Sequence, residues 1–412
     1  MDDLRAALDR ILAQLTRLGA PVAKQLRPGL PDHEIAEMLR DLPFTPPQEL
    51  RALSAWRNGT TGQNYFFPSH NFLSLEEAIA DYHGRREVAN EFASDDLSAD
   101  DLWDPRWFPI FRASYGTEYA MLCPERETDT APMLYVDVEG GAHDVQYTSL
   151  THMLRVLADS YEAGAITRHP DGYLVEDEAT VGAIRRAYSP TRADVALEAL
   201  RQRATGSALT QAINDVIELH DTRAVEPLLA LLREGDTATK HAVILPLGIL
   251  GDEQVVPPLL ALVAAGRQMR GLGGNSPLAY AWHLMNERAR MDSFTRVQAM
   301  DALERIVERT RQPLPLEPFL AAMDDPEPMA PMRAARRLGA SGDARALPAL
   351  LAALGHHDMR ARRAAIEALG QLGDARALAP LRKIVQSPDS DWQPNLRAVA
   401  AAAIARIEAH TA

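Results

Sequence analysis

The sequence is short of cysteine, of lysine and of long apolar runs. Cys123 is the one cysteine among 412 residues, so no disulfide can form within the chain. No apolar stretch reaches the roughly 18 residues that a membrane-spanning helix needs. The first residues are acidic and lack the apolar core of a secretory signal. These shortages predict a soluble cytoplasmic protein with no membrane partner.

Charge is distributed unevenly along the chain. Residues 1–168 contain 27 acidic and 15 basic side chains, whereas the remainder contains 30 and 28. Such an acidic half repels nucleic acid and attracts a basic protein. Lysine occurs only three times among the 43 basic residues, and with abundant alanine this arginine bias indicates a GC-rich bacterial genome.

An aromatic stretch stands out in the acidic half. Residues 103–111 hold two tryptophans, two phenylalanines and an isoleucine. Pro105 and Pro109 exclude a regular helix there, because each lacks an N–H and fixes its φ angle. After Gly116, residues 118–123 are typical of a strand. The stretch predicts a loop with a buried aromatic plug, which is the centre of a small core and not a catalytic site.

Hydrophobic spacing predicts helices and strands around this stretch. We expect helices at 4–18, 32–41, 47–56, 74–92 and 150–163, and strands at 65–67, 118–123, 133–138 and 143–147. Ser74-Leu-Glu-Glu77 has the capping-box pattern of a helix start. Asn58-Gly59 is typical of a turn.

The order of these motifs resembles a known family. Trp56-Arg-Asn-Gly59, the capping box at Ser74, the aromatic stretch and a final Ser149-Leu-Thr helix follow the pattern of the SMI1/KNR4 family, or SUKH superfamily, over residues 25–165. The resemblance implies an α+β domain with a mixed sheet, a binding role and no catalysis. Many bacterial members are immunity proteins that neutralise a toxin made by the same cell, whereas fungal relatives act in cell-wall and signalling regulation.

The sequence repeats from residue 207 onward. The segment that begins at His220 recurs from Gly251, Gly342 and Gly373. A fixed period near 30 residues predicts a helical solenoid, in which each unit must stack on its neighbours to bury its helices. The pattern resembles HEAT repeats of the PBS-lyase type, and residues 266–293 interrupt it.

These observations predict three parts: an SMI1/KNR4-like domain at 1–165, a connector at 166–206 and a HEAT-like repeat solenoid at 207–412. The expected fold class is an α+β N-terminal domain with a small mixed sheet, followed by an all-α HEAT-type solenoid. Oligomeric state stays open.

Several chemical readings compete with a binding role. His356 and His357 beside Asp358 suggest a metal site, but a loop in which Asp358 caps the next helix explains them as well. HEAT-fold metal oxygenases repeat His-Glu pairs, which the repeats lack. Cys123 ends an apolar strand and is expected to be a buried small hydrophobe. We therefore predict no enzyme, no catalytic residue, no metal and no cofactor.

Nucleic-acid binding is a further alternative. Arg360, Arg362 and Arg363 could form a basic strip with Lys240, since phosphate binding needs several cations on one surface. The solenoid as a whole is nearly neutral. In HEAT families the arginine at the Arg360 position commonly pairs with the turn aspartate. We therefore expect no nucleic-acid partner.

An acidic loop is the sharpest candidate for a partner-binding site. Its aspartates could dock the basic face of a toxin, for example a nuclease, by charge complementarity; the plainer alternative is a solvated loop. The candidate residues are Asp95, Asp96, Asp100, Asp101 and Asp104.

The sequence therefore predicts a non-enzymatic immunity protein that neutralises a cognate, basic protein toxin by masking its active surface. The alternative is a regulatory scaffold that binds cellular partners through both of its parts.

Overall fold

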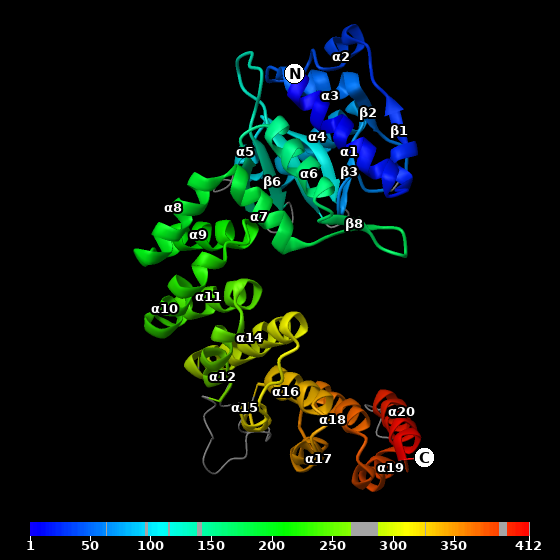
Figure 1. Cartoon of the computed structure of the whole chain (residues 1–412), viewed down its shortest axis with the longest axis vertical. Helices are drawn as coiled ribbons and strands as arrows, with labels where there is room; N and C mark the ends of the chain where they lie inside the picture. The colour runs from blue at the N-terminus through cyan, green and yellow to red at the C-terminus, as the bar shows by residue number, and fades with distance from the viewer. Residues whose placement is uncertain are drawn as a thin grey trace. The chain divides into compact units, whose positions relative to one another are not determined.

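Helices and antiparallel strands make up the first part of the chain, and helix pairs make up the rest, as the computed structural model shows (Figure 1). The structure describes residues 1–62, 64–94, 98–113, 116–137, 142–264, 287–325, 327–386 and 394–411. The chain divides into two units, Met1–Pro190 and Thr191–Ala412. The sequence-based boundaries at 165 and 206 lie on either side of this division.

A five-stranded sheet forms the centre of the first unit. The strand order is β3 (His70–Phe72), β4 (Trp107–Ala113), β5 (Thr117–Leu122), β6 (Met133–Asp137) and β7 (Ala142–Tyr147). Two-stranded sheets pair β1 (Leu26–Pro28) with β2 (Arg57–Thr60), and β8 (Ile166–Arg168) with β9 (Leu174–Glu176). The predicted α+β class is confirmed. Every described strand pair is antiparallel, where a mixed sheet was expected. From β4 to β7 each strand pairs with the next one in the chain, and at most ten residues separate them, whereas parallel pairs need crossovers of about a dozen residues or more.

The helices of the first unit flank the sheet. They are α1 (Asp2–Arg17), η1 (Pro21–Lys24), α2 (Asp32–Met38), α3 (Gln48–Trp56), α4 (Leu75–Phe92), α5 (Ala99–Leu102), α6 (Leu150–Glu162) and α7 (Glu178–Tyr188). Alternation along β5 divides the core. Tyr119 and Met121 join the large cluster with α1, α3 and α6, whereas Ala120 joins Trp103 and Ala89 of α4 in a smaller cluster. Successive side chains of a strand point to opposite faces, so both faces of the sheet are covered.

The aromatic stretch forms a strand in its second half, and the loop predicted there is wrong for residues 107–113. Pro109 lies where the register between β4 and β5 shifts, between Pro109 and Phe111. A bulge of this kind tolerates the missing N–H of proline inside a sheet. The buried plug is confirmed: Trp103, Trp107, Phe108 and Phe111 are each at most 6% exposed.

The Asn58-Gly59 motif lies in β2 and not in the predicted turn. Asn58 is buried, and its Oδ1 accepts the backbone N–H of Leu75 at 2.7 Å, at the start of α4. Gly59 has φ +71°, and a Cβ there would lie 2.2 Å from the backbone nitrogen of Ser74. The capping box of Ser74 and Glu77 is confirmed. The motif thus fixes where α4 begins.

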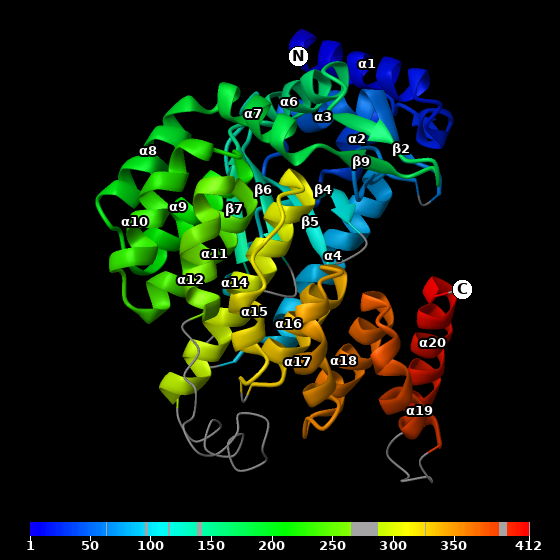
Figure 2. The ribbon, with the colours of Figure 1, turned by 60° about the horizontal axis from the view of Figure 1, so that its bottom comes forward.

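The second unit consists of helix pairs that follow one another in chain order (Figure 2). Its described helices are α8 (Pro190–Arg201), α9 (Gly206–Glu218), η2 (Thr222–Ala224), α10 (Val225–Glu234), α11 (Thr237–Leu250), η3 (Glu253–Val255), α12 (Val256–Ala264), α14 (Glu287–Thr310), α15 (Glu317–Ala322), α16 (Met329–Ala340), η4 (Ala344–Ala346), α17 (Leu347–Ala353), α18 (Met359–Leu372), η5 (Ala375–Ala377), α19 (Leu378–Gln386) and α20 (Pro394–Thr411). One apolar cluster runs from Ala196 to Ile407, as stacked repeats require. No described helix is long and apolar enough to cross a membrane.

The recurring Asp-x-Arg motif starts each of three repeats in the same way. The carboxylate of Asp343 accepts the backbone N–H of Arg345, and the Arg345 guanidinium binds both oxygens of that carboxylate. Asp221 with Arg223, and Asp374 with Arg376, repeat this arrangement. The aspartate thereby caps a short 3-10 turn that leads into the first helix of the repeat.

Close helix contacts hold successive repeats together. A Cβ on Gly339 of α16 would lie 2.6 Å from the Cα of Ala368 of α18, and one on Gly370 would lie 2.9 Å from that of Ala403. Small residues at these crossings allow the helix backbones to approach closely. The buried pair Arg296 and Asp325 adds an ionic contact between α14 and the turn before α16.

Candidate partner-binding site

The acidic segment is partly helical. Asp100 and Asp101 lie in α5, and Asp104 follows it. Ser98 caps α5, since its side-chain oxygen accepts the Asp101 N–H while Asp101 Oδ2 accepts the Ser98 N–H at 3.0 Å. Asp95 and Asp96 lie outside the described residues. The pattern Ser98-x-x-Asp101 was available in the sequence as a signal for this short helix.

Two of the three described aspartates are paired with arginine. Asp100 contacts Arg86 of α4 at 2.8 Å. Asp104 accepts two bonds from the Arg106 guanidinium, at 3.0 and 2.6 Å. This hydrogen bonding holds the pKa of Asp104 below its usual value. Sequence reasoning missed both arginines, although the spacing Asp104-x-Arg106 could have indicated the second pair.

Asp101 keeps its charge without a basic partner in the described part of the chain. Its bonds go to Ser98, and they lower the pKa of the Asp101 carboxyl. At neutral pH this exposed side chain is therefore ionised. Of the three described candidates, Asp101 is the one whose charge is fully open to a cationic partner.

Helix α4 carries this segment. Arg86 of α4 donates to the Trp103 carbonyl at 2.5 Å, and Tyr82 donates to the Pro105 carbonyl at 2.9 Å. Beneath them, Arg85 pairs with Glu118 of β5, a side chain with no exposed surface. Burial raises the pKa of the Glu118 carboxyl. These contacts hold residues 100–105 against α4, and the pair of Arg85 and Glu118 joins α4 to the sheet.

The candidate metal ligands and the candidate nucleophile have structural roles. Asp358 caps α18 through the Arg360 N–H, so the predicted cap is confirmed. The Asp358 carboxylate also pairs with the Arg360 guanidinium at 3.0 Å, whereas the expected partner of Arg360 was the aspartate of the Gly-Asp turn. His356 Nδ1 accepts the Asp358 N–H at 3.0 Å, which removes one ring nitrogen from metal binding. Cys123 is buried without exposed surface, and burial raises the pKa of its thiol. A thiolate nucleophile is therefore disfavoured there.

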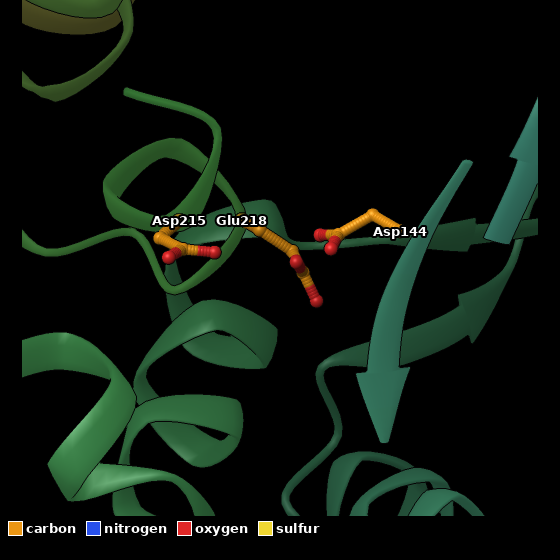
Figure 3. A group of neighbouring side chains, drawn as sticks. All are labelled: Asp144, Asp215 and Glu218. Carbon is orange, nitrogen blue, oxygen red and sulfur yellow. The ribbon is translucent and has the colours of Figure 1, made fainter. Parts of the chain in front are cut away.

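An acidic pair on α9 was not singled out from the sequence. Asp215 and Glu218 lie one turn apart on α9 (Figure 3). Both carboxylates pair with Arg192 of α8, at 2.6 and 2.5 Å. Asp144, drawn in the same view, is a residue of β7 in the first unit. Within the second unit the Arg192 guanidinium offsets the charge of this pair, which joins α8 to α9.

Comparison with known proteins identifies the helical repeats. The family model described as HEAT repeats matches residues 316–405, which span α15 to the main part of α20. The predicted HEAT resemblance is therefore confirmed for this region. No SMI1/KNR4 or SUKH family model matches, and no curated protein matches the chain. The structure and this match define an α+β domain followed by a HEAT-type helical array.

Proposed function

We propose that this chain is a non-enzymatic protein-binding scaffold. The observation that carries the proposal is the array of helix pairs that contains the HEAT-repeat match. Stacked repeats expose one long surface with many side-chain positions, and proteins use such surfaces to hold other proteins. The apolar side chains inside the array already pack against one another, so a protein partner would contact the exposed side chains of the array.

The proposal of no catalysis has support from the candidate nucleophile and ligands. Cys123 is buried, His356 is held by a backbone amide, and Asp104 is held by Arg106. A catalytic site needs a reactive group that faces substrate, often with a perturbed pKa in a cleft. Cys123, His356 and Asp104, whose pKa values are perturbed, lie instead in packed or hydrogen-bonded positions.

A finer proposal is that the partner is a toxin made by the same cell, in particular one with a basic surface. The motif resemblance over residues 25–165 and the acidic charge of residues 1–168 support it. An acidic inhibitor can occupy the cationic cleft of a nuclease, because the opposite charges speed association and favour specificity. A cellular regulatory partner is the alternative within the same class.

The test starts from full-length tagged protein captured from its own cells. One stoichiometric partner that stays bound after purification is expected. The partner gene is then expressed alone and together with the full-length chain, and growth is measured. Arrested growth that is restored by co-expression supports immunity. A harmless partner contradicts immunity and favours the regulatory scaffold, and the absence of any protein partner contradicts the scaffold proposal itself.

A further inference from the structure

The end of α4 exposes apolar side chains that the first unit does not cover. Phe92 is 69% exposed, the largest value for a large hydrophobic side chain in the described part of the chain. Val88, one helical turn earlier, is 49% exposed, and Leu102 of α5 is 37% exposed. We call Val88 and Phe92, which lie one helical turn apart, the α4 apolar surface. Such a group on an otherwise folded unit marks a contact surface.

The side of α4 that packs against the core is not the side that carries Val88 and Phe92. Tyr82 and Ala89 are each 3% exposed and pack into the two core clusters. Val88 and Phe92 are spaced i and i+4, so they share one face, and this face is exposed where the face of Tyr82 and Ala89 is buried. The helix thus has an apolar face beyond the one that folding of the unit uses.

The exposed charges of α4 next to the α4 apolar surface are negative, since Glu91 lies three residues after Val88 and Glu87 lies one turn before Glu91. Glu87 and Glu91 of α4 are exposed, as is Asp101 of α5. The nearby arginines are already engaged, Arg85 by Glu118 and Arg86 by Asp100. An apolar centre with an anionic rim fits a partner surface that has a hydrophobic pocket surrounded by Lys or Arg.

We propose that the α4 apolar surface docks a basic protein partner, with Phe92 as the side chain that enters its pocket. This inference rests on the proposed protein-binding function and specifies its surface and the chemistry of the partner. Aromatic anchors of this kind contribute a large share of binding free energy when the partner buries them. Glu87, Glu91 and Asp101 then orient the encounter by attraction to the cationic rim.

Photo-crosslinking in the full-length chain tests the position. The photoreactive probe p-benzoylphenylalanine replaces Phe92, and separate chains carry it at Val195 of α8, which is 63% exposed, and at Phe294 of α14, which is 50% exposed. A protein crosslinked from position 92 and not from Val195 is expected. A crosslink from Phe294 alone overturns the inference and leaves the proposed function standing. No crosslinked protein from any position contradicts both.

Binding of the purified crosslinked protein then tests the chemistry. Phe92→Ser is expected to weaken its affinity at least about 10-fold through faster dissociation. Glu87→Lys with Glu91→Lys is expected to slow association about 10-fold at low salt and to reduce its salt dependence. Val195→Ser is the matched control, with unchanged binding. Equal affinity of the Phe92→Ser variant, an acidic partner, or a second copy of this chain as the crosslinked protein would overturn the proposal.

Discussion

At the scale of single residues, two glycines in the first unit should respond oppositely to alanine. Gly59→Ala is expected to destabilise the unit by at least about 3 kcal/mol, because a Cβ at φ +71° would collide with the backbone of Ser74. Gly84 lies in an exposed part of α4, where an added Cβ would have no neighbouring atom within 4 Å. Gly84→Ala is therefore expected to raise the free energy of unfolding by up to about 1 kcal/mol.

Urea unfolding of the full chain, monitored by hydrogen exchange of the β4 and β5 amides, measures both free energies. The Gly84→Ala variant controls for the added methyl group, since both changes are chemically identical. Equal stability of the two variants would contradict the close packing of β2 against the start of α4.

A buried histidine gives the first unit a predicted acid sensitivity. His70 stacks on Phe67 at 4.6 Å, and burial lowers the pKa of its imidazole to about 4. In the unfolded chain the imidazole takes up a proton below about pH 6.5, whereas in the folded unit it does so only near pH 4. The neutral, buried histidine therefore contributes its full stabilisation above pH 6.5, and this stabilisation is lost as the pH falls towards 4. The difference between a pKa of 6.5 in the unfolded chain and about 4 in the folded unit corresponds to a loss of about 3 kcal/mol at most in the free energy of unfolding.

The phenylalanine variant isolates this effect. His70→Phe keeps an aromatic ring beside Phe67 but cannot titrate, so its free energy of unfolding should vary less between pH 4 and pH 6.5. Hydrogen exchange of β3 to β5 reports on this unit. His356, which lies just before α18 and whose pKa is also lowered to about 4, serves as an internal reference in the second unit, where the pH dependence should persist. An unchanged slope in the first unit would show that His70 is protonated in the fold.

At the scale of elements, the buried pair of Arg296 and Asp325 should control the contact between α14 and α16. Their side chains are 6% and 1% exposed, and Ser293 also donates to Asp325 at 2.8 Å. Asp325→Ala leaves the arginine charge buried without a partner, which is expected to cost about 3–5 kcal/mol.

Hydrogen exchange of the α14 and α16 amides measures the loss of stability in the Asp325→Ala variant. The control is Arg345→Ala, which removes an exposed guanidinium from an Asp-x-Arg motif of the same unit and should change protection little. A double variant, Arg296→Met with Asp325→Leu, should recover much of the stability, because an apolar pair avoids the unpaired charge. Failure of the single variant to loosen α16 would argue that water reaches Arg296.

The elements also show what the sequence could predict. The repeats were readable because three of the four recurring segments start with the same Asp-x-Arg turn, the fourth keeps the aspartate, and the spacing is regular, all of which are local features. The strand at 107–113 could not be predicted, because a proline such as Pro109 disfavours a strand unless the register shift beside it is known. Glu49 was also missed. It is fully buried, and its carboxylate accepts the N–H groups of Leu150 and Thr151, residues about 100 positions away.

The same distinction holds for the candidate site. Composition indicated the acidic segment, but the pairing of Asp100 with Arg86 depends on how α4 lies beside α5. The exposure of Phe92 likewise depends on which face of α4 meets the sheet, and α4 has apolar residues on more than one side. A helix wheel alone cannot choose between such faces.

At the scale of the whole molecule, the net charge of −14 separates a protein-binding scaffold from a nucleic-acid-binding solenoid. Exposed arginines of the array have acidic neighbours: Arg363 pairs with Glu367, and Arg382 with Glu408. Few cations are therefore available to displace counterions from phosphates. We expect no retention of an approximately 25-base-pair DNA duplex by the full chain, even at low salt.

Fluorescence anisotropy of the labelled duplex measures this. The variant Glu304→Lys with Glu308→Lys and Glu367→Lys turns three array carboxylates into cations and serves as the positive control. It should gain salt-sensitive binding, since each phosphate contact steepens the dependence of affinity on salt. Tight, salt-sensitive binding by the unaltered chain would contradict the expectation and make the arginines of α16 and α18 a nucleic-acid surface. Binding by the variant alone would show that these carboxylates keep the array from nucleic acid and leave it to a protein partner.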